Sequence, residues 1–160
     1  MTRTALCAAF VAALIAVPAH AQETPVNKGQ SSAWLNEQQA ALADATQADG
    51  WYTLDGGVKF RRTAGDGTGP APTVQDTVTV HYTGKLTDGT TFDSSRGRDP
   101  ATFPLGRLVK AWQIAIPYMG VGDTAEILVP AEMGYGARGA GPIPPASTLW
   151  FEIELLGIED

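Results

Sequence analysis

Alternation of apolar and polar residues is the clearest pattern along the 160-residue chain. Between Thr77 and Thr83 every second residue is apolar, which places Val78, Val80 and Tyr82 on one face. The segment from Thr148 to Ile158 alternates in the same way, with Leu149, Phe151, Ile153 and Leu155 on one side and Glu152 and Glu154 on the other. Such segments are typical of antiparallel strands with one face on a core and one in water.

Shorter segments predict further strands around these two. Residues 51–62 favour a strand interrupted by Gly56-Gly57, and residues 65–72 (GDGTGPAP) form a loop because their glycines and prolines exclude regular structure. Asp88-Gly89 provides a turn into a strand that carries Phe92. Residues 125–129 are a further apolar strand. The strands together predict an antiparallel sheet.

A short helix is expected between Leu108 and Ile116. Leu108, Trp112 and Ile116 are spaced at i, i+4 and i+8, so they share one helix face. Pro117 and Gly120 then end the helix. A sheet that covers one short helix is an α+β arrangement.

A second helix is predicted nearer the N-terminus, from about Ser32 to Ala48, with Ser31 or Ser32 as its cap. Its partly apolar stripe consists of Trp34, Leu35, Ala41, Leu42 and Ala45. We interpret it as a short helix that packs on its own domain. Pairing with a second chain is the alternative, which the brief, alanine-rich stripe disfavours.

The first 21 residues have the layout of a secretory signal peptide. Arg3 precedes an uncharged apolar stretch from Ala5 to Val17, and Ala19-His20-Ala21 is a small-x-small cleavage site. We expect cleavage after Ala21 and export, with the periplasm as the preferred destination. A retained membrane anchor is the alternative, but the apolar stretch is shorter than the ~20 residues that span a bilayer. Residues 22–50 would form a lead-in and the short helix, and residues 51–160 the main domain.

Composition narrows the class of protein. Cys7 is the only cysteine and lies in the leader, so the mature chain would have no disulfide and must fold by burying a core. The formal net charge of −6 would fall to about −7 once Arg3 is removed, which favours solubility. No basic run suits phosphates, and we therefore expect no nucleic-acid partner.

The residues argue against several kinds of catalytic or cofactor site. The mature chain has a single histidine, His81, which alternation places opposite Tyr82, so we expect no metal site and no catalytic histidine. Residues 134–139 match G-x-G-x-x-G, a dinucleotide motif, but the prolines and glycines that follow cannot open the required helix. We interpret this stretch as a loop that overhangs a pocket, and we expect no cofactor.

Several ordered segments together resemble the FKBP family of peptidyl-prolyl cis-trans isomerases. The resemblance runs from about Gly57 to Ile158 and is carried by 80–84 (VHYTG), 88–96 (DGTTFDSSR), Trp112, 120–123 (GVGD), 134–136 (GYG), 143–145 (IPP) and 149–156 (LWFEIELL). It implies a five- to six-stranded antiparallel half-barrel wrapped around one short helix, preceded here by the N-terminal helix. It also implies that residues 51–160 form an isomerase domain acting on proline-containing polypeptides, with macrolide inhibitors as further ligands. We expect a monomer.

The resemblance also assigns site residues. It implies catalytic roles for Tyr82, Asp93 and Tyr135, and an apolar substrate cup made of Phe92, Leu108, Val109, Trp112, Ile143 and Phe151. Trp112 would form the floor, while the Val109 amide and the Tyr135 hydroxyl would bond substrate carbonyls. A carboxylate beside apolar groups is costly unless it is paired, so we expect the Tyr82 hydroxyl to donate to Asp93.

Two departures from the family pattern keep an alternative open. Ala101 stands where an aromatic residue is common, and Ala140 replaces a larger loop residue, so the pocket would be more open. A module that binds proline-containing segments with little catalysis is therefore the second hypothesis. A third, an acidic β-sandwich adhesion domain, leaves the helix at Leu108–Ile116 unexplained.

Overall fold

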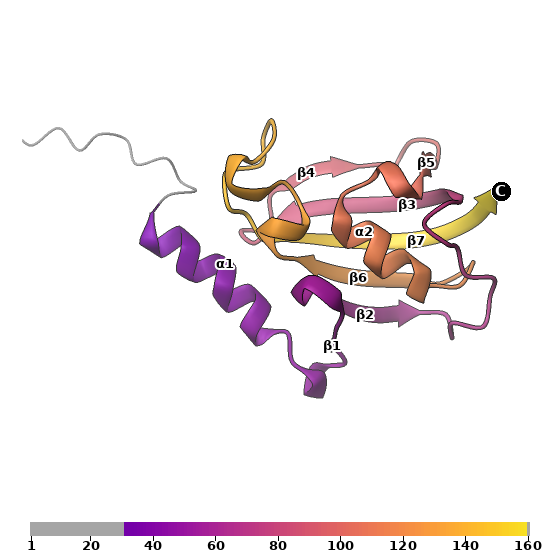
Figure 1. The fold of residues 1–160 in the computed structure, drawn as a ribbon, viewed down its shortest axis with the longest axis horizontal. Coiled ribbons are helices and arrows are strands. Elements are labelled where there is room, and N and C mark those ends of the chain that lie inside the picture. Colours follow the sequence, from indigo (N-terminus) through magenta and orange to yellow (C-terminus); the bar gives the residue numbers. More distant parts are fainter. Residues whose placement is uncertain (1–30, 160) are drawn as a thin grey trace, which may run out of the picture.

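The computed structural model describes residues 31–159, and the predicted signal peptide and lead-in up to Gln30 lie outside this range. Within it, seven strands form one antiparallel sheet in the order β1-β2-β6-β7-β3-β4, and β5 also pairs with β3 (Figure 1). The helices are α1 (Ser32–Asp44) and α2 (Lys110–Ala115), and the strands are β1 (Tyr52–Thr53), β2 (Lys59–Ala64), β3 (Thr77–Leu86), β4 (Thr91–Ser94), β5 (Ala101–Pro104), β6 (Thr124–Val129) and β7 (Leu149–Glu159).

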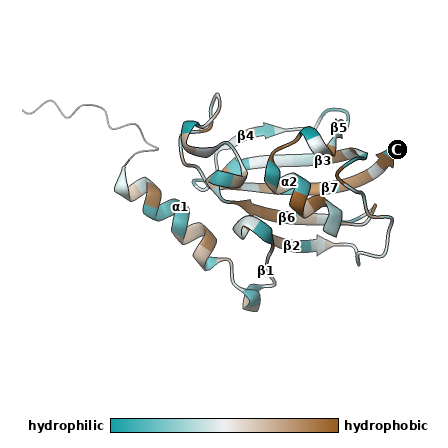
Figure 2. Cartoon of the chain, viewed as in Figure 1, coloured by the Kyte–Doolittle hydropathy of each residue, from teal (hydrophilic) through white to brown (hydrophobic). Residues whose placement is uncertain are grey.

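The pair β3–β7 is the centre of the sheet, and it confirms the alternation read from the sequence. Its register runs from Thr77 opposite Glu159 to Leu86 opposite Leu149, with one irregularity after Thr79. Every second residue of β3 is buried, and β7 buries Leu149, Phe151, Ile153 and Leu155. Each fully buried apolar side chain contributes about 1.5–3 kcal/mol, so this face holds much of the folding free energy. In Figure 2 the arrowhead end of the neighbouring strand β6 is brown, and β6 buries Ala125, Ile127, Leu128 and Val129.

Helix α2 crosses the inner face of the sheet and buries Ala111, Trp112 and Ala115 (Figure 1). A 3₁₀ turn, Ile116–Tyr118, which contains Pro117, follows the helix directly. The predicted start at Leu108 is wrong, because Leu108 has extended backbone after a separate turn, Leu105–Arg107. The side chain of Gln113 donates to the Leu108 carbonyl at 2.7 Å, so this carbonyl has a hydrogen-bond partner outside a helix.

Helix α1 packs on its own chain, as the preferred interpretation expected. Ala45 lies in a small cluster with Trp51 and Leu128, against which Leu42 and Trp150 also pack. The helix ends at Asp44 rather than Ala48, and a separate 3₁₀ turn, Gln47–Asp49, follows it. The Thr46 hydroxyl donates to the Asp49 carboxylate across this turn at 2.6 Å.

The apolar stripe predicted for α1 is only partly correct. Leu35 is 40% exposed, whereas Gln38 is only 4% exposed and occupies the middle of the buried face between Trp34 and Ala45. A buried polar side chain must find partners, and a hydropathy pattern cannot indicate where those partners are.

The sheet has more strands than the five or six expected. The strand predicted at residues 51–62 is divided into β1 and β2 by the turn Asp55–Gly57, close to the expected interruption. β5, of four residues, was not predicted, because it is too short to show an alternation. β4 and β5 divide one edge of β3 between them: β4 pairs with Thr83–Lys85, and β5 pairs with Thr77–Val80.

A buried carboxylate joins three segments on the far side of the core. Asp123 is 2% exposed and accepts hydrogen bonds from the amides of Gly120 at 2.9 Å and Gly67 at 3.1 Å. The Arg62 guanidinium also donates to it at 2.9 Å. Gly65 leaves the necessary space, since a Cβ there would lie 2.0 Å from an Asp123 oxygen.

We expect Asp123→Asn to lower the free energy of unfolding by about 2–4 kcal/mol, because it leaves buried donors without a charged acceptor. Burial alone raises the pKa of Asp123, but the two amides and Arg62 lower it overall. A lowered folded-state pKa stabilises the fold above the ordinary value of 3.8, and this contribution is lost as the pH falls through the folded pKa.

Urea denaturation at pH 7 and at lower pH measures this effect. The difference between wild type and Asp123→Asn should be largest at neutral pH and shrink in acid, while exposed Asp99→Asn should change little at either pH. An equal loss for both variants would contradict the role of Asp123.

Candidate active site

One cavity of about 230 Å³ opens beside α2. Strands β3, β4, β5 and β7, the start of α2 and the loop after β6 all contribute to it, through Tyr82, Phe92, Asp93, Phe103, Leu108, Val109, Trp112, Tyr135 and Phe151. The lining is thus mainly aromatic and aliphatic, with one carboxylate and two phenols.

Trp112 is the centre of the aromatic lining. Its ring meets Tyr82 and Phe151 edge-to-face, each with a centroid distance of 5.4 Å and interplanar angles of 81° and 87°. Phe103 meets it at 6.4 Å and 79°, and Phe92 continues the series from Phe151 at 5.5 Å and 88°. Edge-to-face ring pairs are stabilised beyond the area that they bury. These contacts therefore hold the surrounding rings, which form the walls, nearly perpendicular to the Trp112 ring, which forms the floor.

Three residues of the lining each carry a donor that has no protein acceptor within residues 31–159. The indole N–H of Trp112 is buried without a partner. The amide of Val109, just before α2, and the hydroxyl of Tyr135 also donate to no atom of the described chain. Unused donors in an apolar hollow favour a ligand that carries carbonyl oxygens.

The polar edge of the cavity is a phenol–carboxylate pair. The Tyr82 hydroxyl donates to Asp93 at 2.6 Å, which is the hydrogen bond expected from the sequence. Burial, followed by this bond and the nearby charge, raises the pKa of Tyr82 to about 12. Tyr82 therefore remains a neutral donor at any physiological pH.

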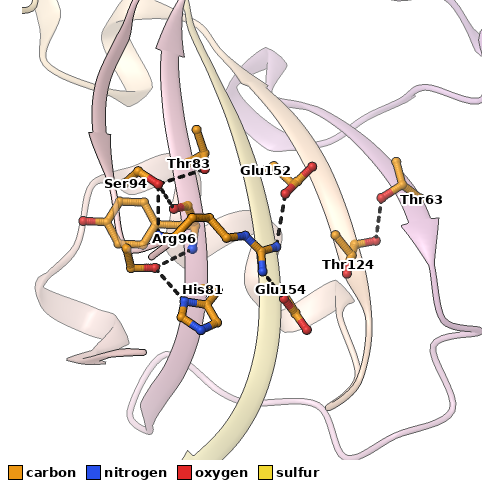
Figure 3. Close-up of polar contacts among 10 residues, drawn as sticks. Thr63, His81, Thr83, Ser94, Arg96, Thr124, Glu152 and Glu154 are labelled. Atoms are coloured by element: carbon orange, nitrogen blue, oxygen red, sulfur yellow. Dashed lines mark hydrogen bonds and ion pairs between the residues drawn. The ribbon is translucent and has the colours of Figure 1, made fainter. Parts of the chain in front are cut away.

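Backbone contacts fix the two partners relative to each other. Ser95 accepts from the Tyr82 amide at 2.9 Å through its side chain, and its own amide donates to the Tyr82 carbonyl at 3.0 Å. Ser94 bonds the same carbonyl and also Thr83 (Figure 3). His81 belongs to this outer network through Ser95 at 3.1 Å, on the face away from the cavity, as expected.

Arg96 ties the end of β4 to the central strand. Its guanidinium donates to Glu154 at 2.5 Å and to Glu152 at 3.1 Å, both on the outer face of β7 (Figure 3). Arg98 lies 3.8 Å from Asp93 but is largely exposed. The carboxylate of the site therefore sits at the end of a strand that is held at several points.

The residues that the sequence predicted for the site lie together, with one exception. Tyr82, Asp93, Tyr135, Phe92, Leu108, Val109, Trp112 and Phe151 all line the cavity. Ile143 does not line it, although its side chain is buried in the same core as Tyr82, Trp112 and Phe151. Their catalytic and binding roles remain predictions.

Two residues of the site were missed by the sequence reading. Phe103 lines the cavity from β5, whereas Ala101, two residues earlier, does not. Gly84 makes room for the walls, since a Cβ there would lie 2.6 Å from Phe92 and 2.8 Å from Phe151. β5 is too short for its alternation to indicate Phe103, and no sequence pattern indicates a close approach of two rings.

Other site classes receive no support from the described residues. Among residues 31–159 no three His, Cys, Asp or Glu side chains lie together as metal ligands do. No helix in that range has the length and apolarity to cross a bilayer. After the G-x-G-x-x-G stretch, Ala140 and Ile143 form a bridge where a dinucleotide site requires a helix.

The sequence matches a known family over the part that builds the cavity. The family profile described as FKBP-type peptidyl-prolyl cis-trans isomerase matches residues 69–156. The FKBP-type 22 kDa peptidyl-prolyl cis-trans isomerase of Escherichia coli is 42% identical over 141 residues, which are 87% of this chain and 68% of that protein.

Further similarities include an outer membrane protein and a solved structure. The outer membrane protein MIP of Legionella longbeachae is 38% identical over 83% of this chain and 54% of its own length. The crystal structure of a peptidyl-prolyl cis-trans isomerase from Pseudomonas syringae pv. tomato has a TM-score of 0.73 and 33% identity, covering 79% of this chain and 93% of that chain.

We expect Gly84→Ala to displace the rings of Phe92 and Phe151, because the added methyl group cannot fit between them. Gly157→Ala in β7 is the matched control, since its Cβ would meet only Thr79, at 3.9 Å. Near-ultraviolet circular dichroism should change for Gly84→Ala alone, with a loss of about 1–3 kcal/mol in unfolding free energy. Identical spectra and stabilities for the two variants would contradict the proposed constraint.

Proposed function

The chain belongs to the family of FKBP-type peptidyl-prolyl cis-trans isomerases, and from this premise we propose that it accelerates rotation about X-Pro bonds in exported proteins. The reaction takes place without covalent chemistry in the aromatic cavity. The observation that carries the proposal is the convergence of Tyr82, Phe92 and Phe151 around the floor formed by Trp112.

Rotation about an X-Pro bond needs no nucleophile. The planar amide is stabilised by resonance, and breaking that resonance gives a barrier of roughly 18–20 kcal/mol. As the amide twists it loses charge separation, so the twisted form depends less on water than either planar form. An apolar cup that removes water therefore binds the twisted form better, and only such differential binding accelerates the reaction.

The shape of the cavity suits a proline ring, as an apolar cup for the twisted amide requires. Upright aromatic walls on an aromatic floor give flat apolar surfaces for the pyrrolidine, and the open side leaves space for the chain to enter and leave. Desolvation alone does not supply the about 8 kcal/mol of a million-fold acceleration, so oriented hydrogen bonds must add to it.

The unused donors provide that orientation. The Val109 amide and the Tyr135 hydroxyl hold the carbonyls on either side of the rotating bond. The pKa of Tyr135 is raised, mainly by burial and then by the charge of Asp93, so its hydroxyl stays protonated. The Tyr82–Asp93 pair fixes the rim against which the twisting carbonyl turns.

Binding without much catalysis is the second candidate. Ala101 leaves part of the rim without an aromatic side chain, so the same cavity would hold proline-containing segments of unfolded chains loosely. In that case the isolated protein would show little isomerase activity and would still keep an unfolded protein in solution.

Export is the proposed setting for either activity. The support is the layout of residues 1–21, with Arg3, the apolar stretch and Ala19-His20-Ala21, together with the similarity to a protein named for the outer membrane. The periplasm is the proposed location. Macrolides are proposed as ligands of the same cavity, and the mature chain is proposed to act as a monomer.

A protease-coupled assay with an X-Pro peptide tests the proposal. We expect activity from wild type and a roughly tenfold lower kcat/KM from Tyr82→Phe, since a charge-assisted hydrogen bond is lost. Tyr52→Phe is the control because Tyr52 is 59% exposed on β1, away from the cavity. Unchanged activity in Tyr82→Phe would rule out the role of the Tyr82–Asp93 pair. An inactive wild type that still keeps an unfolded protein in solution would favour the binding module.

A further inference from the structure

The loop of residues 130–148, here called the pocket loop, carries Tyr135 to the cavity. Its conformation depends on Ala146, which has a φ of +55°, a region that residues other than glycine seldom adopt. The Ala146 amide donates to the carbonyl of Gly136 at 3.0 Å, directly beside Tyr135. A residue with an unfavourable backbone conformation is thus bonded to the neighbour of Tyr135, which lines the cavity. Such strain persists only where neighbouring contacts hold it.

Helix α1 supplies those contacts from more than a hundred residues away. The Trp34 indole donates to the carbonyl of Pro145 at 3.2 Å, just before Ala146. The Gln38 side chain accepts from the Thr148 amide at 2.8 Å, and the Gln38 carbonyl accepts from the Thr148 hydroxyl at 3.0 Å. The helix therefore holds the chain on both sides of Ala146.

The same glutamine also reaches the other wall of the site. Its amide nitrogen donates to the Thr87 hydroxyl at 3.0 Å, in the turn between β3 and β4. Those strands carry Tyr82 and Asp93. One side chain thus connects the pocket loop to the turn between the strands of the phenol–carboxylate pair.

The burial of these hydrogen bonds favours one position of the pocket loop. Gln38 and Thr148 are 4% and 2% exposed, so any arrangement that separates them leaves polar groups without partners and without water. A leucine at position 38 would bury as well, but its side chain would bond neither segment, and only the backbone carbonyl would still accept from the Thr148 hydroxyl. The polar residue therefore specifies one position of the loop where an apolar residue would allow several.

We propose that Trp34 and Gln38 are positioning residues for the active site, which hold the pocket loop so that the Tyr135 hydroxyl faces the substrate. The path runs from Trp34 to Pro145, through Ala146 to Gly136, and so to Tyr135. The inference rests on the proposed isomerase function for its effect on catalysis. The coupling between α1 and the loop stands on the hydrogen bonds themselves.

The test compares Gln38→Leu and Trp34→Phe with a control on the same helix, Gln39→Leu, which changes an exposed neighbour. Gln38→Leu removes the side-chain bonds to Thr148 and Thr87 and leaves the backbone carbonyl at position 38 as an acceptor for the Thr148 hydroxyl. Trp34→Phe removes the bond to Pro145. Both variants have a large apolar side chain at the buried position. We expect a roughly tenfold lower kcat/KM for Gln38→Leu, mostly through a higher KM, and a smaller decrease in the same direction for Trp34→Phe. Gln39→Leu should match wild type.

A double-mutant cycle separates positioning from a general loss of structure. If Gln38 acts through Tyr135, Gln38→Leu should cost little further activity once Tyr135→Phe is present. Full additivity, or a Gln38→Leu variant with the activity of Gln39→Leu, would overturn the proposal.

Hydrogen exchange provides a readout that needs no activity. The amides of Ala146 and Thr148 should exchange at least tenfold faster in Gln38→Leu and in Trp34→Phe, while those of β3 and β7 keep their protection. Unchanged exchange in the loop overturns the proposal even if activity falls. If wild type has no isomerase activity, the proposed function fails, and the exchange experiment still decides whether α1 holds the loop.

Discussion

The edge-to-face packing of Trp112 against the sheet is the interaction on which the rest of the structure depends. A single indole on α2 contacts rings from β3, β5 and β7, so it fixes the helix against three strands at once. Perpendicular rings form walls and a floor, and they leave a hollow where interdigitated aliphatic side chains would have filled the space. The core and the cavity are therefore built from the same contacts. Gly84 is the condition for this arrangement, because any side chain there would occupy the place of two rings.

The fold was largely predictable because its main strands are half-buried and long. β3 presents one face to the core along all ten of its residues and β7 does so from Leu149 to Leu155, so burial requires every second residue to be apolar. The Tyr82–Asp93 hydrogen bond followed from the cost of a bare carboxylate beside aromatic rings. Short elements gave no such signal, and β5, with Phe103, was overlooked for that reason.

The errors have a common physical cause, which is that contacts distant in sequence decided the outcome. Leu108 shares the spacing of a helix face, yet a preceding turn and the Gln113 side chain keep it extended. Gln38 looks like a solvent-facing residue in the sequence, and only the position of Thr148 explains why it is buried. Periodicity describes the exposure of a residue and says nothing about its partner.

The division of one edge of β3 between β4 and β5 limits how the protein can hold another chain. An extended peptide can extend a sheet by pairing with a long free edge, which binds backbone regardless of side chains. Here β1, β4 and β5 are two to four residues long, and the rest of the outer edge of β2 carries Arg61 and Arg62. The pairing of a further strand along these edges is therefore disfavoured, because none of them offers a long row of free backbone groups.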